Sequence, residues 1–72
     1  MNSSTYPKLQ LTWEKSREAR YWCEENISPR AYWFHSQIGG KGWKIYSTNS
    51  DGYWYLETDD PAYISWIQLT LN

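Results

Sequence analysis

Two stretches of the chain alternate apolar and polar residues. Residues 8–13 (KLQLTW) place their three apolar residues on one side, and residues 67–71 (IQLTL) repeat this pattern. A period of two residues is typical of a strand with one buried face, so we expect a short strand at each place. Residues 1–7 are polar and end in a proline, which is typical of a frayed terminus.

Residues 13–27 change to a helical period. Thr12 can cap a helix that starts at residue 13, and Pro29 prevents the helix from continuing. The helical spacing aligns one narrow stripe of small and apolar residues, made of Ser16, Ala19, Cys23 and Ile27. Charged residues occupy the opposite side, so the helix is expected to cover a core with one face only.

Three aromatic-rich segments follow, separated by short loops that end in glycine. Residues 31–38, 43–48 and 53–58 are expected to be strands, because aromatic and β-branched residues favour strands. The loops GGKG (residues 39–42) and NSDG (residues 49–52) suit tight turns that close through a left-handed glycine. These segments therefore predict consecutive antiparallel strands.

Asp60 followed by Pro61 indicates a helix start, and the apolar pattern predicts a short helix over residues 61–67. The whole pattern predicts a single α+β domain over residues 1–72. It would hold a small antiparallel sheet with one main N-terminal helix and one short C-terminal helix on one face. A variant of the ferredoxin-like fold is one arrangement that fits.

The turns fix which residues lie opposite one another, and this register fixes the two faces of the sheet. Pairing Thr48 with Tyr53, and Ile38 with Trp43, sorts the three central strands into two sets. The set expected to face the core comprises Tyr32, Phe34, Ile38, Trp43, Ile45, Trp54 and Leu56. The set expected on the other face comprises Trp33, His35, Gln37, Lys44, Tyr46, Thr48, Tyr53, Tyr55 and Glu57.

Aromatic residues supply the bulk that so short a chain needs for a core. Six Trp, seven Tyr and one Phe make up 19% of the 72 residues, and each ring can bury about 150–250 Å². The single cysteine, Cys23, cannot form an intramolecular disulfide, and the single histidine, His35, does not make a zinc cluster. We therefore expect no metal and no other cofactor.

The charge balance limits the classes of partner. A net charge of -1 argues against binding to duplex DNA, which needs a basic surface, and is too balanced for an acidic mimic of nucleic acid. The sequence has no apolar run of membrane-spanning length, no signal-peptide pattern and no lipidation motif. A lone cysteine suits a reducing compartment. These features predict a soluble cytoplasmic protein without a membrane partner.

Catalysis is not expected, and we assign no catalytic residue. His35 has no Ser or Cys that the predicted strands would bring within reach. The loop at residues 39–42 lacks the spacing and the following helix of a phosphate-binding loop. Cys23 lies on the buried stripe of the helix, where a free cysteine packs as a small apolar residue.

The amphipathic face is the expected binding site, because Tyr and Trp dominate interface hot spots and a monomer seldom exposes so many rings together. The residues expected to contact a partner are Trp33, His35, Lys44, Tyr46, Tyr53 and Tyr55. The partner is a protein, single-stranded RNA or DNA stacked on the rings, or further copies of the chain in an oligomer or virion. Nucleic acid is less favoured, since few lysines lie on this face. A ladder that only stabilises the sheet is the remaining interpretation.

The segment GYWYLETDDPAYISWIQLTLN resembles the C-terminal end of many short accessory proteins from large tailed bacteriophages and cyanophages, and GGKGWKIY has the same character. The resemblance covers about the last 40 residues. It implies a viral protein made in the cytoplasm of a bacterial host, in a class rich in inhibitors and small virion components. Together with the aromatic face, it predicts a non-enzymatic protein that binds a host protein and inhibits or modulates it, in host takeover or anti-defence.

Overall fold

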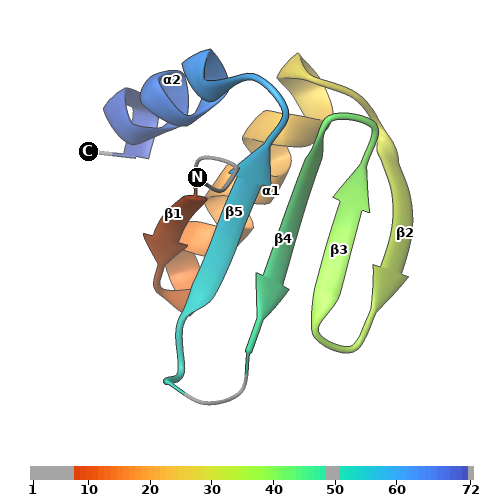
Figure 1. The fold of residues 1–72 in the computed structure, drawn as a ribbon, viewed down its shortest axis with the longest axis vertical. Helices are drawn as coiled ribbons and strands as arrows, with labels where there is room; N and C mark the ends of the chain where they lie inside the picture. The colour runs from red at the N-terminus through yellow and green to blue at the C-terminus, as the bar shows by residue number, and fades with distance from the viewer. Residues whose placement is uncertain (1–7, 49–50, 72) are drawn as a thin grey trace, which may run out of the picture.

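The computed structural model describes residues 8–48 and 51–71. Five strands and two helices follow one another as β1 (Lys8–Leu11), α1 (Trp13–Asn26), β2 (Arg30–Phe34), β3 (Gln37–Gly40), β4 (Trp43–Ser47), β5 (Trp54–Thr58) and α2 (Pro61–Leu71). The strands form one antiparallel sheet in the order β1-β5-β4-β3-β2 (Figure 1). The α+β prediction, with a longer first helix and a shorter second one, is confirmed. The expected frayed terminus lies outside the described residues.

The order of the elements differs from the β-α-β-β-α-β order of the ferredoxin-like fold, so that part of the prediction is wrong. Four strands run consecutively from β2 to β5, and the chain makes one long connection, through α1, between the two edges of the sheet. β1 therefore lies beside β5, although the two strands stand at opposite ends of the sequence (Figure 1).

Helix α1 begins and ends close to the predicted residues. The Thr12 hydroxyl accepts a hydrogen bond from the Lys15 backbone N–H at 3.2 Å, which satisfies one of the free donors of the first turn. The Ile27 N–H donates to the Cys23 carbonyl and closes the last turn before Pro29. Ser16, Ala19 and Cys23 are the buried residues of α1, as predicted. Ile27, the fourth residue of the predicted stripe, is the C-cap and is only partly buried against the core.

The segment expected to be one strand over residues 31–38 is in fact two strands, because the chain reverses at His35 and Ser36. The next turn contains Lys41 and Gly42, and Gly42 takes the positive φ of +92° that the turn needs. Gly39 and Gly40, expected in that turn, instead lie inside β3. A Cβ at Gly39 would lie 2.5 Å from the Tyr32 hydroxyl. Glycine is therefore needed at this position to leave space for the Tyr32 ring, and not to form a turn.

The observed register confirms one predicted strand pair and corrects the other. Between β4 and β5, Tyr46 lies opposite Tyr55 and Ile45 opposite Leu56, as predicted. Between β3 and β4, the Cα partner of Ile38 is Ile45 rather than Trp43.

The added hairpin and the shifted register change the face of several residues. Tyr32 and Phe34 lie on the face away from the helices, not in the core. Trp33 pairs with the buried Ile38 and so lies on the helix side. His35 lies in the hairpin turn, and Tyr53 precedes β5 rather than belonging to it.

Helix α2 extends over the whole of Pro61–Leu71, so the closing strand predicted at residues 67–71 is wrong. The same residues satisfy a helical spacing, since Ile64, Ile67 and Leu71 recur at i, i+3 and i+7 and are the buried residues of α2. Asp60 starts the helix as predicted, because its carboxylate accepts the Ala62 N–H at 2.9 Å. The far end is tied to α1, where the Lys15 ammonium donates to the Leu71 carbonyl at 2.5 Å.

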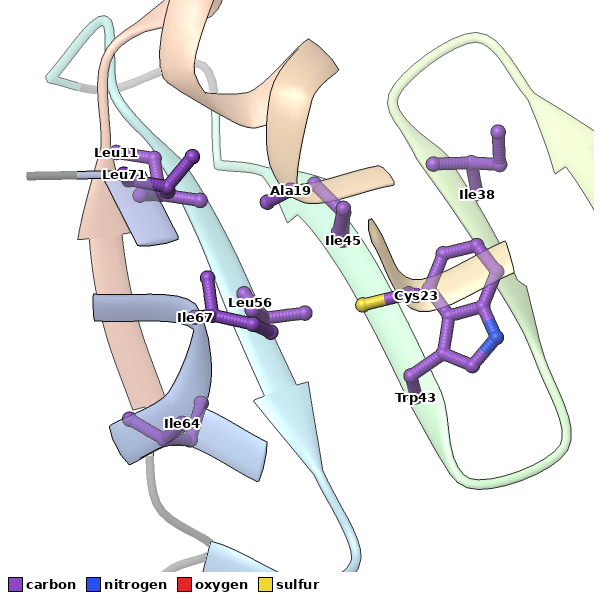
Figure 2. Packing of buried hydrophobic residues seen from close by; sticks show 10 residues of the cluster. All are labelled: Leu11, Ala19, Cys23, Ile38, Trp43, Ile45, Leu56, Ile64, Ile67 and Leu71. Atoms are coloured by element: carbon purple, nitrogen blue, oxygen red, sulfur yellow. The ribbon is translucent and has the colours of Figure 1, made fainter. Parts of the chain in front are cut away.

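Both helices pack on the same face of the sheet and enclose the core there (Figure 2). Ala19 and Cys23 of α1 and Ile67 of α2 meet Ile45 and Leu56 from the central strands, and all five are almost completely buried. The Trp43 indole closes one end of the core, and its N–H donates to the Ser28 carbonyl at 3.0 Å. One face of the sheet is thereby buried in the core. Neither helix covers the opposite face of the sheet.

Candidate binding surface on the open sheet face

The face that the helices leave uncovered carries every second residue of the strands. We call it the open face and define it, from the register, as Lys8, Gln10, Tyr32, Phe34, Gln37, Lys44, Tyr46, Tyr55 and Glu57. Charged and amide side chains stand among the rings, so the surface is amphipathic. Surfaces of this composition are typical of interfaces, where aromatic side chains supply contact area and polar groups fix orientation.

Tyr46 and Tyr55 form the centre of the open face. Their ring centroids are 5.8 Å apart, and the interplanar angle is 34°. The Tyr46 hydroxyl donates to a Glu57 carboxylate oxygen at 2.5 Å. The Tyr55 hydroxyl donates to the Asp51 carboxylate. Each ring is therefore held both by its neighbour and by a carboxylate, and the pair presents a fixed surface.

Two lysines lie over these rings. The Lys8 ammonium is 5.3 Å from the centroid of Tyr55, and the Lys44 ammonium is 5.5 Å from that of Tyr46. Lys44 also forms an ion pair with Glu57 at 3.9 Å. Cation–π contacts of this kind contribute about 0.5–1 kcal/mol at exposed sites, so they order the lysine chains across the surface.

The pKa values of both tyrosine hydroxyls are raised. Burial, followed by the hydrogen bond to Glu57, raises the pKa of Tyr46 to about 12. The hydrogen bond to Asp51 raises the pKa of Tyr55, and the same bond lowers the pKa of Asp51. At neutral pH both phenols are therefore uncharged donors, while Asp51 brings negative charge to the Tyr55 end of the pair.

The open face continues onto β2 through residues that sequence reasoning placed in the core. The rings of Tyr32 and Phe34 lie with their centroids 5.6 Å apart. The Gln37 amide donates to the Tyr32 hydroxyl at 3.1 Å, which fixes the ring over Gly39. Phe34 is 66% exposed, more than most large side chains of the described chain. The surface is thus wider than the sequence indicated.

The structure brings together only part of the predicted site. Lys44, Tyr46 and Tyr55 lie side by side on the open face, as expected. Trp33 was expected beside them but lies on the helix side of β2, under the guanidinium of Arg20. His35 is exposed in the β2–β3 turn, and Tyr53 is exposed before β5, where its N–H donates to Asp51 at 3.0 Å.

Sequence reasoning missed a second group of exposed apolar side chains, which lies on the helices. Trp66 and Leu69 of α2 are 61% and 75% exposed, and Trp13 and Tyr21 of α1 are also exposed. The signal was present in the sequence, since α2 (PAYISWIQLTL) contains no charged residue. A surface helix normally carries charge on its outer side.

Metal-ligating side chains and the single thiol are possible chemical groups among the described residues. Within residues 8–48 and 51–71, no group of three His, Cys, Asp or Glu side chains is placed to hold a metal ion. The Cys23 thiol is buried, and burial raises its pKa to about 12, which leaves almost no nucleophilic thiolate at neutral pH. No helix in the same two ranges has the length and apolarity needed to cross a membrane.

Comparisons with protein-family models, with curated proteins and with solved structures found no match. The open face is an aromatic surface on which lysines and carboxylates lie beside the rings.

Proposed function

We propose that this protein is a non-catalytic binding module that docks on a partner protein through the open face. The observation that carries the proposal is the Tyr46–Tyr55 pair, whose rings contact each other and whose hydroxyls are both bonded to carboxylates. A surface fixed before binding loses little side-chain entropy when a partner arrives. Tyrosines held in this way are the residue type that contributes most at protein interfaces.

The charges of the open face favour a protein over single-stranded nucleic acid. Stacked bases bring phosphates close to the rings, and phosphates need unpaired cations nearby. Here Lys44 is paired with Glu57, and Asp51 stands at the hydroxyl of Tyr55. Each platform ring has a carboxylate as well as a lysine beside it, so the face carries no net excess of cations for a phosphate backbone. A protein partner can instead donate hydrogen bonds to these carboxylates.

The resemblance to accessory proteins of tailed bacteriophages supports a bacterial host protein as the partner. On that proposal the module acts in the bacterial cytoplasm and inhibits or modulates a host enzyme or defence protein by covering part of its surface. A chain of this size can act by steric occlusion alone, since a standard interface buries about 800 Å² on each partner. The whole open face would then be used.

The test is affinity capture from a bacterial lysate, with and without nuclease, followed by measurement of the affinity for the isolated partner. Three forms of the tagged protein are compared: the natural chain, Tyr55→Ala on the open face, and Trp66→Ala on the helix side as the matched control. Circular dichroism establishes that each variant is folded. We expect Tyr55→Ala to cost about 2 kcal/mol, or roughly thirtyfold in affinity.

A discrete protein that resists nuclease, is captured by Trp66→Ala and is lost with Tyr55→Ala supports the proposal. Material removed by nuclease would replace it with single-strand binding. Capture lost with Trp66→Ala but kept with Tyr55→Ala would move the site to the uncharged helix α2. If nothing is captured and the protein associates with itself in light scattering, the role is that of an assembly subunit.

A further inference from the structure

Strand β2 is the most exposed strand of the sheet and forms one of its edges. Four of its five residues are exposed, and the fifth, Tyr32, is half-buried. No strand of the described chain pairs with its outer edge. The pairing of β2 with β3 is irregular between Arg30 and Tyr32, so the regular stretch of open backbone N–H and C=O groups lies over residues 32–34. Extended segments of other proteins bind at such edges by adding a strand.

Two arginines gather around one ring on the helix side of this edge. The guanidinium carbon of Arg30 is 4.7 Å from the centroid of Trp33, and that of Arg20 in α1 is 5.3 Å from it. Trp33 itself is 62% exposed. We call these three residues the Arg–Trp cluster. It lies across the sheet from the open face.

The cluster has an excess of positive charge. Among the described residues, neither guanidinium makes an ion pair, and no side-chain hydrogen bond to either is present. The Nε atom of Arg20 is buried without any partner, which is costly for a charged group. Glu24 lies one turn further along α1 but does not reach within 4.0 Å of Arg20. No carboxylate of residues 8–48 or 51–71 therefore pairs with either guanidinium group, although such groups normally hold an anion.

The two sides of β2 thus differ in chemistry. On the helix side a ligand would meet Arg20 and Arg30, and on the open side it would meet the rings of Tyr32 and Phe34. We propose that the β2 edge binds an extended segment of another protein, in which acidic and apolar residues alternate, as a sixth strand. Its carboxylates would pair with the two guanidinium groups, and its apolar residues would cover the two rings.

Charge also decides against a second copy of this chain as the occupant. Antiparallel pairing of β2 with β2 of another copy would place both Arg–Trp clusters on the same side of the joined sheet. Four guanidinium groups would then share one region without a counter-ion, and like charges across neighbouring strands are destabilising. An acidic strand removes this repulsion.

The test uses a capped peptide of seven residues in which Glu and Val alternate. It is titrated into the nitrogen-15-labelled protein and followed by the amide resonances. Two control peptides replace every Glu with Lys, or the central residue with Pro, which cannot donate to a strand ladder. We expect saturable binding of the Glu peptide with shifts centred on residues 30–34. The Lys and Pro peptides should not bind measurably.

Two variants of the protein test whether the guanidinium charge of the Arg–Trp cluster contributes to binding. Arg30→Gln removes one exposed guanidinium charge and should weaken the Glu peptide about tenfold, because charge-assisted pairs are the strong ones. Lys44→Gln removes a cation from the open face and should leave the affinity unchanged. This site does not depend on the proposed function of the open face, so either can fail alone.

Equal binding of the Glu and Lys peptides would refute the role of the arginines. If the Pro peptide binds as tightly as the Glu peptide, strand addition is refuted. If the shifted amide resonances centre on Tyr46 and Tyr55, the peptide binds the open face instead. No binding of the Glu peptide at millimolar concentration would overturn the proposal. Concentration-dependent dimerisation with shifts in β2 would favour a second copy of the chain instead.

Discussion

Replacing Gly39 with alanine tests the register that defines the open face. A Cβ at this position would lie 2.5 Å from the Tyr32 hydroxyl oxygen and 2.8 Å from both the Tyr32 Cζ and the Trp43 carbonyl oxygen. Contacts under 3.0 Å essentially never occur for a Cβ atom, so something must shift. The Tyr32 ring can rotate away, but the Trp43 oxygen belongs to the backbone of the paired strand.

The cost follows from these contacts. Overpacking of this kind destabilises a folded protein by about 1–3 kcal/mol. Alanine is intrinsically better than glycine in a strand by roughly 0.5–1 kcal/mol, which offsets part of the cost. We therefore expect Gly39→Ala to lower the free energy of unfolding by about 1–2 kcal/mol and the Tm by roughly 5–15 °C, because the domain is small.

Thermal unfolding followed by circular dichroism measures the effect, and a double-mutant cycle assigns it. Tyr32→Ala removes the ring, so Gly39→Ala should cost less in that background than in the natural chain, by about 0.5 kcal/mol or more. If Gly39→Ala leaves the Tm unchanged or raises it, Gly39 has free space around it. The register of β2, β3 and β4, and with it the membership of the open face, would then be wrong.

Two further predictions follow from perturbed pKa values. The pKa of Cys23 is raised by burial from 9.0 to about 12, so at pH 8 a thiol reagent should react about a thousandfold more slowly with the folded than with the unfolded protein. Rapid modification of the folded protein would contradict the burial of Cys23 between α1 and the sheet. The pKa of Tyr46 is raised in the fold from 10.0 to about 12, so its stabilising contribution is complete below pH 10 and is lost as the pH rises towards 12. Phenolate absorbance should show a late-titrating component, to which Tyr55 also contributes; it should become smaller in Tyr46→Phe and begin at lower pH in Glu57→Gln. Identical curves for the natural chain and both variants would refute the hydrogen bond.

The sequence predicted helix α1 well, because several local signals agreed. Thr12 offered a cap, Pro29 offered a stop, and Ser16, Ala19 and Cys23 offered a stripe with helical spacing. The register between β4 and β5 was also predictable, because Gly52 lies in the connection between the two strands rather than inside one of them. Gly52 takes a φ of +78°, as a turn glycine should.

The β2–β3 hairpin was not predictable from local signals. Its turn residues, His35 and Ser36, are not strong turn formers, whereas Gly39 and Gly40 are. The glycine-rich segment does contain the next turn, which Gly42 closes, but Gly39 and Gly40 belong to β3. Those two glycines are required by the ring of Tyr32 and by the Pro29 carbonyl, whose oxygen would lie 2.4 Å from a Cβ at Gly40. Such contacts between distant segments do not exist until the sheet has formed.

The strand prediction for residues 67–71 was wrong for a different reason. The sequence of residues 67–71 satisfies both periods, since Ile67, Leu69 and Leu71 alternate while Ile64, Ile67 and Leu71 follow a helix. Burial decided between them: Leu69 is 75% exposed, whereas Ile67 is completely buried. The predicted site failed at Trp33 and His35 because both depended on the register around the missed hairpin.

The pairing of β1 with β5 has a consequence for a chain that is synthesised from its N-terminus. Leu9 acquires its partner Leu56 only after nearly the whole domain has been made. Until then α1 has no completed sheet to cover, and an isolated helix of 14 residues is marginal in water. We therefore expect Ser16, Ala19 and Cys23, which α1 buries in the finished fold, to lack their packing partners until β5 has been made.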